Sequence, residues 1–229
     1  MSEREKIFAR IREALSIKAP LPGHARELAL DRHYSTSEFR KFLPPVGDTF
    51  ESRLELFRKN ATALKVDFHF AKSREQTVSF LVALRESEKW TKVGTHSGKE
   101  TDFVVGKVQL PVCRTDKGYD VRDLESCNVG ITECDALVAQ TGSVLVTSRT
   151  AGGRALSVLP PHHVVLARSS QLLGDLPEAM TFLKKAYAPN YPSFISLITG
   201  PSRTGDIERI LVLGAHGPKK LTVLCFQDT

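Results

Sequence analysis

Apolar residues recur along this chain at two spacings, and the two spacings predict alternating helices and strands. Apolar side chains three or four residues apart mark helices over residues 2–16, 48–64 and 73–84. Short continuous apolar runs, typical of buried strands, occur at Val66–Phe70, Val144–Thr147, His163–Ala167, Phe194–Ile198 and Leu221–Phe226. Because strands of this kind alternate with helices, we predict an α/β fold with a mostly parallel sheet and helices on both faces.

Polar residues at the starts of the helical segments predict where those helices begin. Ser73-Arg-Glu-Gln76 is a capping box, and Asp48-Thr-Phe-Glu51 resembles one with Asp in place of Ser or Thr. Asp175-Leu-Pro-Glu178 combines a capping residue with an early proline, so we expect a helix from there to about Tyr187.

Three further stretches carry weaker patterns. Residues 99–118 are expected to be irregular, with one or two short strands within Val104–Val112. Thr132-Glu-Cys-Asp135 is expected to cap a short helix through Val138, and Asp206–Leu213 is expected to form a short helix or a helical turn.

The chain divides into two predicted parts. Residues 1–45 form an N-terminal helical arm and linker, because Pro20, Pro22 and Gly23 interrupt any regular element and Pro44-Pro45 ends whatever precedes it. Residues 46–229 form the α/β domain. With 229 residues in all, the chain is long enough for one large domain with such an extension.

Composition narrows the classes of partner. The net charge is +6, but basic and acidic residues are interleaved, so we predict no nucleic-acid binding. No apolar run approaches the roughly 20 residues that span a bilayer, and the N-terminus lacks a signal-peptide core. We therefore predict a cytoplasmic protein with no membrane association. The cysteines form no C-x-x-C pair, and nothing in the sequence resembles a zinc or iron–sulfur ligand array, so no metal is expected.

The most distinctive polar stretch is Ile195–Glu208, ISLITGPSRTGDIE. It is predicted to run from a buried strand through a tight loop to a helix start at Asp206. Ser202 and Thr204 offer hydroxyl groups, and Arg203 offers a planar fork of donors that suits a carboxylate or phosphate. We predict that these three residues bind a small anion.

Other loops are expected to join this site at the carboxyl ends of the strands, where ligands bind in parallel sheets. They are Thr95–Gly98 and the Gln140–Ser143 turn, in which Thr141, Gly142 and Ser143 are candidate ligand-binding residues. An ordinary turn before a strand remains an alternative for the second loop. For Arg203, a structural salt bridge remains an alternative to anion binding.

Three side chains are candidates for catalysis by proton transfer: His216, Asp206 and Glu208. His216 lies between two small residues, although a plain surface histidine remains possible. Asp206 and Glu208 have an alternative role as a helix N-cap and a first-turn acid. The adjacent pair His162-His163 points to opposite faces of a strand, so the two rings are not expected to chelate one metal.

Familiar nucleotide and hydrolase motifs are absent from the sequence. There is no G-x-G-x-x-G after a strand, no G-x-x-x-x-G-K-[ST] and no G-x-S-x-G. The site predicted above therefore matches none of these common site motifs.

Two long segments resemble the LUD domain of the lactate utilization protein C family (LutC/YkgG). They are DALVAQTGSVLVTS with GRALSVLPPHHVVLA, and ITGPSRTGDIERILVLGAHGPKKLTVLCF. The resemblance implies a Rossmann-like fold similar to the NagB/RpiA/CoA transferase-like superfamily. It also implies a component of a bacterial system that oxidises L-lactate to pyruvate. Iron–sulfur clusters are then expected in partner proteins, and no cofactor is expected in this chain. The family often has Glu where this chain has Gln140, which weakens the case for a covalent transferase mechanism.

Three functional hypotheses follow from these observations. The first is a non-autonomous subunit of a lactate-oxidising complex that binds a small anionic metabolite. The second is a stand-alone isomerase, acyl-transferase or ligase acting on a phosphorylated or CoA-linked substrate. The third is an assembly or regulatory module without a working pocket.

Overall fold

The computed structural model describes residues 3–16, 43–204 and 212–228. The chain separates into an N-terminal unit, residues 1–44, and a compact unit, residues 45–229. Within the first unit, α1 (Glu3–Ser16) is the predicted helix, and it leaves Ile7, Phe8 and Ile11 exposed.

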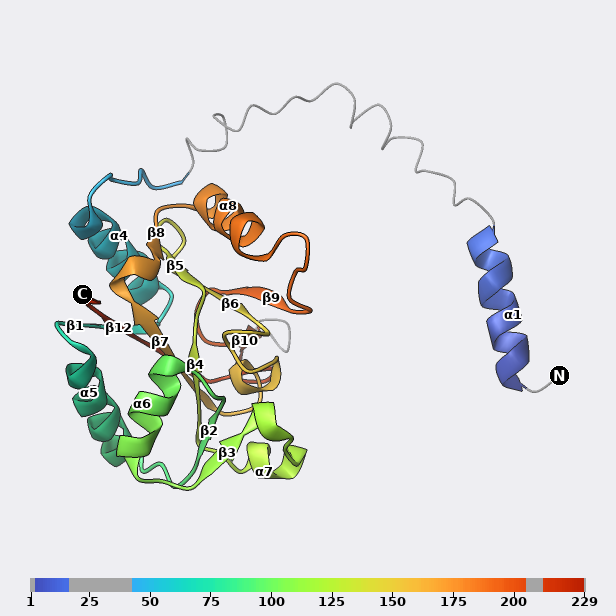
Figure 1. Cartoon of the computed structure of the whole chain (residues 1–229), viewed down its shortest axis with the longest axis horizontal. Coiled ribbons are helices and arrows are strands. Elements are labelled where there is room, and N and C mark those ends of the chain that lie inside the picture. Colours follow the sequence, from blue (N-terminus) through green and yellow to red (C-terminus); the bar gives the residue numbers. More distant parts are fainter. Residues whose placement is uncertain (1–2, 17–42, 205–211, 229) are drawn as a thin grey trace. The chain divides into compact units, whose positions relative to one another are not determined.

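A six-stranded parallel sheet forms the centre of the compact unit (Figure 1). The strand order is β1-β12-β7-β4-β2-β3. The strands are β1 (Asp67–Ala71), β12 (Lys220–Phe226), β7 (His162–Arg168), β4 (Val129–Glu133), β2 (Val93–Thr95) and β3 (Val112–Arg114). This arrangement confirms the predicted mostly parallel sheet.

Helices α5 (Arg74–Ser87) and α6 (Lys99–Val108) cover one face of this sheet. Their apolar side chains pack against Val129, Ile131 and Leu224. Ser73 caps α5 as predicted, because its hydroxyl accepts a hydrogen bond from the Gln76 amide.

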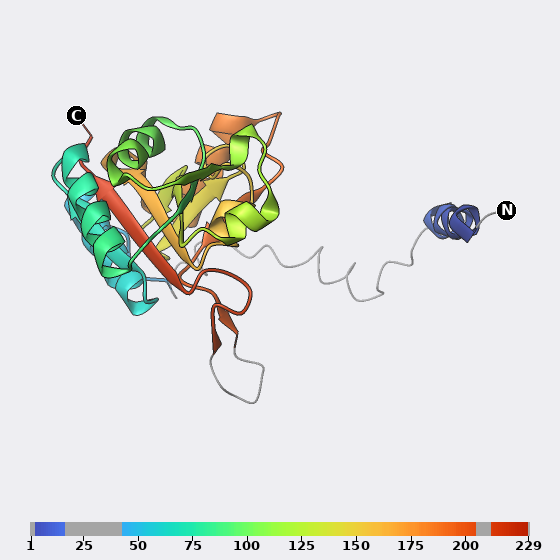
Figure 2. The ribbon, with the colours of Figure 1, turned by 90° about the horizontal axis from the view of Figure 1, so that it is seen from below.

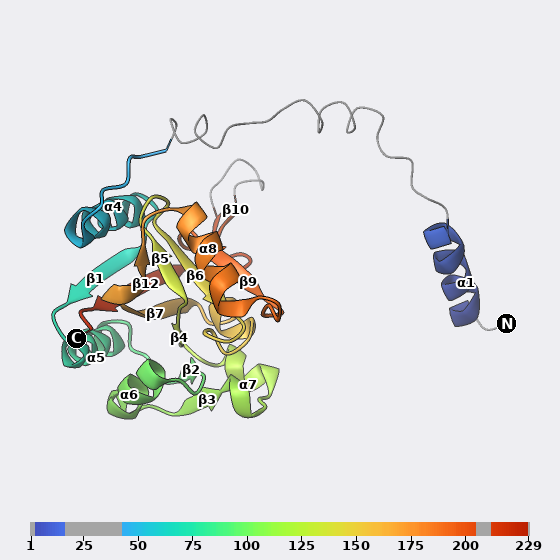
Figure 3. The same ribbon diagram turned by 45° about the horizontal axis from the view of Figure 1, so that its top comes forward.

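A second sheet covers the other face together with α4 (Phe50–Ala63). Its order is β8-β5-β6-β9, and its strands are β8 (Leu172–Leu173), β5 (Ala136–Val138), β6 (Ser143–Thr147) and β9 (Ile195–Ile198). Helix α8 (Leu176–Tyr187) packs on the outer face of this sheet through Ala179 and Leu183 (Figure 3). The sequence predicted α8 and its Asp175 cap, but it did not predict a second sheet.

The remaining elements are short. Helix α7 (Val121–Glu125) precedes β4, and 3-10 turns occupy Thr115–Lys117, Ala155–Ser157 and Ser169–Gln171. Strands β10 (Arg203–Thr204) and β11 (Val212–Leu213) pair antiparallel and project from the body of the domain (Figure 2).

Three local predictions were wrong, and a fourth is contradicted at its last two residues. The segment expected to be irregular forms α6, because its apolar residues Val104, Val105 and Val108 lie at helical spacing. The short helix expected after Asp135 is strand β5, because Leu137 and its neighbours pair with β6.

The other two predictions concern the start of one helix and the last residues of another. Thr49, not Asp48, caps α4, through a 3.2 Å hydrogen bond from the Ser52 amide. Of the helix or helical turn expected over Asp206–Leu213, residues 206–211 lie outside the described part of the chain, and Val212–Leu213 form strand β11.

Candidate functional site

The carboxyl edge of the six-stranded sheet gathers polar side chains from several strands. We use this term for the edge at which the parallel strands end, at Ala71, Thr95, Glu133, Arg168 and Phe226. Open α/β sheets bind their ligands beyond this edge, because backbone amides and helix starts converge there.

Glu133, at the end of β4, fixes the start of α6. One carboxylate oxygen, Oε1, accepts hydrogen bonds from the amides of Glu100 (2.8 Å) and Thr101 (3.2 Å). A Cβ at Gly98 would lie 2.2 Å from this oxygen, so a larger residue there would displace the carboxylate from these amides. The negative charge of Glu133 therefore lies at the start of α6, where the helix dipole stabilises an anion.

A hollow of about 330 Å³ lies at this edge between the starts of α5 and α6 and the ends of β7 and β12. We call it the carboxyl-edge pocket. Its lining carries four cationic side chains against three anionic ones, so its charge favours an anion. The lining residues are Lys72, Ser73, Arg74, Glu75, Lys99, Glu100, Arg168, Phe226, Gln227 and Asp228.

Three of the charged groups in the carboxyl-edge pocket, Arg74, Glu100 and Asp228, are already engaged. Arg74 Nε lies 2.6 Å from a carboxylate oxygen of the buried Glu100, and the same guanidinium stacks 3.7 Å above the Phe103 ring centroid. Asp228 accepts hydrogen bonds from the Ser169 hydroxyl (2.5 Å) and the Ser170 amide (2.9 Å). Both Arg74 and Asp228 therefore have structural partners.

Partial burial acts to raise the pKa of Asp228, but these hydrogen bonds outweigh it and bring that pKa to about 2. The carboxylate of Asp228 is therefore charged at neutral pH and already satisfied by its serine partners.

Arg168 is different, because it forms no ion pair with any residue in the described ranges. It is the last residue of β7, and it lines both the carboxyl-edge pocket and a neighbouring hollow of about 320 Å³. A guanidinium offers paired donors in one plane, which match a carboxylate or phosphate. Arg168 is thus the best-placed group for holding an anion at this edge.

The neighbouring hollow adds two carboxylates, Glu133 and Asp135. Asp135 is buried and accepts hydrogen bonds from the Thr150 hydroxyl at 2.5 Å and from the Tyr187 hydroxyl. Burial first, and then the Asp135 hydrogen bond, raise the pKa of Tyr187. Tyr187 therefore remains a neutral donor to Asp135 at neutral pH.

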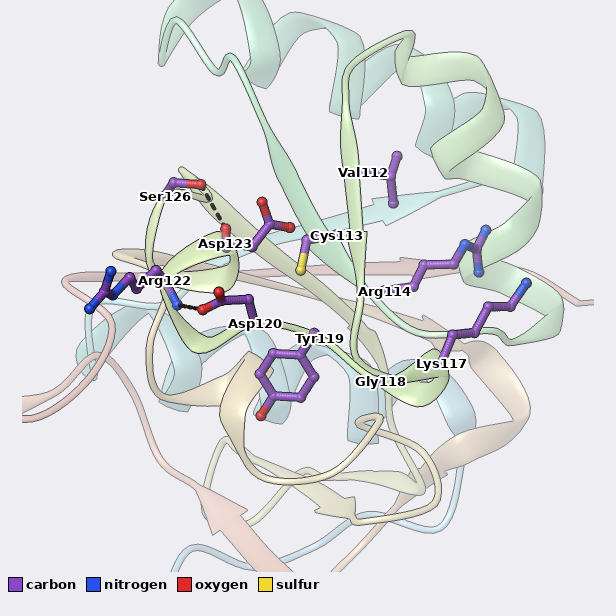
Figure 4. A pocket seen from close by; sticks show the side chains of 10 residues that line it. All are labelled: Val112, Cys113, Arg114, Lys117, Gly118, Tyr119, Asp120, Arg122, Asp123 and Ser126. Atoms are coloured by element: carbon purple, nitrogen blue, oxygen red, sulfur yellow. Dashed lines mark hydrogen bonds between the residues drawn. The ribbon is translucent and has the colours of Figure 1, made fainter.

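A larger hollow lies elsewhere, beside the edge strand β3 and α7, and measures about 740 Å³. Figure 4 shows Arg122 on one side, and Arg114 and Lys117 on the other, directed away from the Cys113 thiol between them. Most of its lining residues are exposed. Because its charges diverge and its walls are open, we do not place the candidate site there.

Two of the three predicted loops lie side by side. The Ser143 hydroxyl is 2.8 Å from the Thr199 hydroxyl, and Gly142, at φ +64°, packs against the backbone of α4 at Ala61. The Arg203 side chain is exposed, and its guanidinium donates a hydrogen bond to the carbonyl of Leu64 at the end of α4.

The three loops do not meet at one rim. Thr95–Gly98 belongs to the carboxyl edge, whereas Pro201 lies near the opposite edge of the same sheet, where the strands begin. The error arose because β9 belongs to the second sheet, so the loop after it does not follow a strand of the parallel sheet.

The other predicted site residues are placed as follows. Thr141 is half-buried, and its hydroxyl has no hydrogen-bonding partner within the described part of the chain. Ser202 donates its backbone amide to the Pro218 carbonyl, and Thr204 pairs with Val212. His216 is exposed in the loop before β12. Asp206 and Glu208 lie outside the described residues.

Gln140 lies in the β5–β6 turn, away from the carboxyl edge. Its backbone carbonyl accepts a 2.9 Å hydrogen bond from the Asn60 side chain, and its backbone amide donates a hydrogen bond to the Gly174 carbonyl. The structure thus places Gln140 in the packing between α4 and the second sheet.

The sequence prediction missed Arg168 and Glu133. Arg168 directly follows the apolar run of β7, and Glu133 directly follows that of β4. A charged residue at the end of a buried parallel strand was the signal, and it is visible in the sequence. His162 and His163 bond to Thr222 and Thr132 respectively, on different strands, so they share no ligand.

Within the described ranges, no three His, Cys, Asp or Glu side chains come together as a metal site would require. In the same part of the chain, no helix is both long enough and apolar enough to cross a bilayer.

These features define the class first: an α/β protein with a Rossmann-like parallel sheet and polar hollows at its carboxyl edge. The sequence profile of the LUD domain matches residues 54–225, and the chain belongs to the LUD domain family. The resemblance seen in the sequence is thereby confirmed.

Similar proteins carry the name Lactate utilization protein C. That of Anoxybacillus flavithermus is 26% identical over 93% of this chain and 91% of its own length. Those of Geobacillus sp. (36% identical) and Bacillus subtilis (34% identical) align over 45% and 49% of this chain. In these two cases the chain matches about half of the relative's length, 44% and 48%.

A solved structure shares the fold. The crystal structure of a DUF162 family protein from Deinococcus radiodurans superposes with a TM-score of 0.60 at 18% identity. The match covers 79% of this chain and 99% of that chain.

Proposed function

We propose that this chain is a component of a bacterial system that oxidises L-lactate to pyruvate. The support is the family membership and the names of its relatives, one of which aligns over 93% of the chain. The same support makes the cytoplasm the proposed compartment.

Within that system, we propose that the carboxyl-edge pocket binds a small carboxylate metabolite. The observation that carries this proposal is Arg168, a cation without an ion pair in the described ranges, at the end of a central strand. The start of α5 faces the same pocket, and its dipole adds to the attraction for an anion. The predicted ligand-binding residues of the Thr141–Ser143 and Ser202–Thr204 loops would then act outside this pocket.

Oxidation of lactate to pyruvate releases two electrons and two protons, so the reaction requires an electron acceptor. We propose that iron–sulfur proteins of the same system are that acceptor and that this chain is a non-autonomous subunit. Its proposed role is to hold the anion, with the carboxylates of Glu133 and Asp135, which line the same hollow as Arg168, as the candidate acceptors of the two protons.

A second function is favoured by those same carboxylates. A pocket edge that combines Arg168 with Glu133 and Asp135 also suits a stand-alone isomerase, acyl-transferase or ligase. Turnover by the purified chain without partners would support this second function over the first.

The proposed function is tested in a bacterial strain that lacks its own copy of this protein. Arg168→Gln should lower lactate-dependent dye reduction and growth on lactate by about tenfold or more, since a charge-assisted hydrogen bond contributes about 1.5–3 kcal/mol. Arg122→Gln, at an exposed arginine beside the hollow at β3 and α7, is the matched control and should behave as wild type. Equal activity of the two variants would contradict the role of Arg168. Unimpaired growth on lactate without the protein would contradict the proposed function.

A further inference from the structure

The parallel pairing between β4 and β7 ends before β7 does. Its last pair is Glu133 with Leu166, whereas β7 continues beside β12 as far as Arg168. After Glu133 the chain leaves the sheet through Cys134 and Asp135 and enters β5 of the second sheet. In the described part of the chain, Arg168 therefore has a strand neighbour on its β12 side but none on its β4 side.

The side chain of Gln171 connects the two segments where this pairing stops. It lies in the 3-10 turn that directly follows β7, and its Oε1 accepts a 2.7 Å hydrogen bond from the Arg168 backbone amide. Its Nε2 donates to the Cys134 carbonyl at 2.6 Å and to the Asp135 carbonyl at 3.4 Å. One amide group thus joins the end of β7 to the link between β4 and β5.

This bridge requires the chemistry of a primary amide. An amide accepts through its oxygen and donates through its nitrogen, so it can bond to an N–H group on one segment and to a carbonyl on another. The opposite orientation would place the Gln171 oxygen against two backbone carbonyls, so the network fixes which end faces which segment. Gln171 is half-buried, and water therefore replaces these bonds only in part.

A second set of hydrogen bonds holds the other side of the same turn. The Ser169 hydroxyl and the Ser170 backbone amide donate to Asp228, which lies just after β12. The turn is therefore tied to β12 through Asp228 and to the β4–β5 link through Gln171. Arg168, directly before the turn, is held on both sides.

The groups that Gln171 joins belong to the candidate site. Arg168, Glu133 and Asp135 line the hollow of about 320 Å³ together with Gln171 itself. The bridge therefore sets the separation between the cation at the end of β7 and the carboxylates on either side of Cys134. Such support matters, because a site that is about 1 Å too loose binds poorly even when every group is present.

We propose that Gln171 is a positioning residue, which holds Arg168 where it binds the carboxylate metabolite. The Gln171 amide already bonds to three backbone groups, so it acts through Arg168 and not on the ligand. This inference rests on the proposed function, because it concerns the group that binds the metabolite there.

The test is a titration of the full-length chain, labelled with ¹⁵N, with sodium pyruvate, followed by NMR. Gln171→Met keeps the length of the side chain but removes the bridge, and it should weaken pyruvate binding about fivefold or more. Gln109→Met, the same change at an exposed glutamine at the end of α6, is the matched control and should bind as wild type does. Folded and unfolded chains give separate signals, so lower stability is not mistaken for weaker binding.

A gentler variant covers the case in which Gln171→Met does not fold. Gln171→Asn keeps the amide but is one methylene shorter, so it can reach the Arg168 amide or the Cys134 carbonyl but not both. It should weaken pyruvate binding about threefold.

A double variant separates positioning from a general disturbance of the pocket. If Gln171 acts through Arg168, adding Gln171→Met to Arg168→Gln should change the pyruvate affinity by less than about twofold. A general disturbance would weaken binding by the same factor with and without Arg168.

Two results would overturn this inference and leave the proposed function intact. They are wild-type affinity in both Gln171→Met and Gln171→Asn, and a Gln171→Met effect of equal size in the presence and absence of Arg168. If the wild-type chain does not bind pyruvate at all, the proposed metabolite site is contradicted, and this inference with it.

Discussion

The two ends of β7 show how one strand can carry polar residues of two kinds. At the carboxyl edge, Arg168 carries a permanent charge, and the acids around it are held by hydroxyl groups and amides. At the opposite edge, where the parallel strands begin and which we call the amino edge, His162 is buried and neutral, and its Nε2 lies 2.9 Å from the Thr222 hydroxyl. The carboxyl edge is therefore suited to bind an anion, whereas the polar residues of the amino edge bond to each other within the fold.

The largest expected effect is that of acid, because the buried histidines and Asp228 should lower the stability of the fold at different pH values. Burial lowers the pKa of His162 to about 4 and that of His163 to about 3. Below pH 6.5 the unfolded chain therefore binds protons at these positions that the folded chain does not, and stability falls as the pH drops from 6.5 towards 4.

The expected loss between pH 6.5 and 5 is about 2–4 kcal/mol, measured by urea unfolding. His69 acts in the opposite direction, because its hydrogen bond to Asp67 raises its pKa, but 33% of its side chain is exposed, so solvent screening weakens its effect. His216→Gln, at an exposed histidine, should leave the profile unchanged. A stability that is flat between pH 7 and 5 would show that the buried histidines do not behave as described.

At the carboxyl edge, Asp228 should lose its contribution to stability only at a lower pH. The pKa of Asp228 is lowered to about 2, so its contribution is fully present above the ordinary value near 3.8 and is lost as the pH falls from 3.8 towards 2. Ser170→Ala should reduce this second loss of stability, while leaving the loss between pH 6.5 and 5 unchanged.

Removing the Glu133 carboxylate should give the next largest effect. Glu133→Ala leaves the amides of Glu100 and Thr101 without their acceptor, so the free energy of unfolding should fall by about 2–3 kcal/mol. For a domain of this size, that corresponds to a melting temperature roughly 5–10 °C lower. Glu125→Ala, at an exposed position of α7, is the control. A melting temperature as high as that of the control would contradict the capping role of Glu133.

A smaller effect is expected at the amino edge from Thr222→Val, which removes the partner of His162 Nε2 while keeping the side-chain shape. We expect a loss of about 1–2 kcal/mol and a mixture of ring tautomers in the NMR spectra. A single unchanged tautomer would mean that Thr222 does not fix the proton position.

The smallest expected effect is that of Arg203→Ala. Its exposed guanidinium donates to the Leu64 carbonyl, so the loss of stability should be about 0.5–1 kcal/mol. If Arg203 instead binds the metabolite, as the sequence predicted, this variant should weaken pyruvate binding as strongly as Arg168→Gln does. Calorimetric titration of both variants distinguishes the two cases.

The sequence predicted the central sheet well, because parallel strands buried on both faces read as continuous apolar runs and caps mark the starts of their helices. It predicted β7, β12, α5 and α8 for this reason. It missed α6, because Gly106 and several polar residues weaken the apolar periodicity there.

The candidate site was harder to predict than the fold. Chain order does not say which of two sheets a strand joins, and β9 joined the second sheet, which carried the Arg203 loop away from the carboxyl edge. Arg168 directly follows the apolar run that correctly predicted β7. A single arginine at the end of a strand, however, is too common to predict a binding site. Only the register of β7 with β12 brings it to the same place as Asp228.

The most direct test of the account is the affinity of the full-length chain for pyruvate, measured by calorimetry at low salt. Pyruvate carries the carboxylate that Arg168 is proposed to bind, so its affinity reports directly on the carboxyl edge. We predict that Arg168→Gln weakens pyruvate binding about tenfold or more while Arg122→Gln binds as wild type does. Wild-type affinity in Arg168→Gln would contradict the assignment of the site to the carboxyl edge.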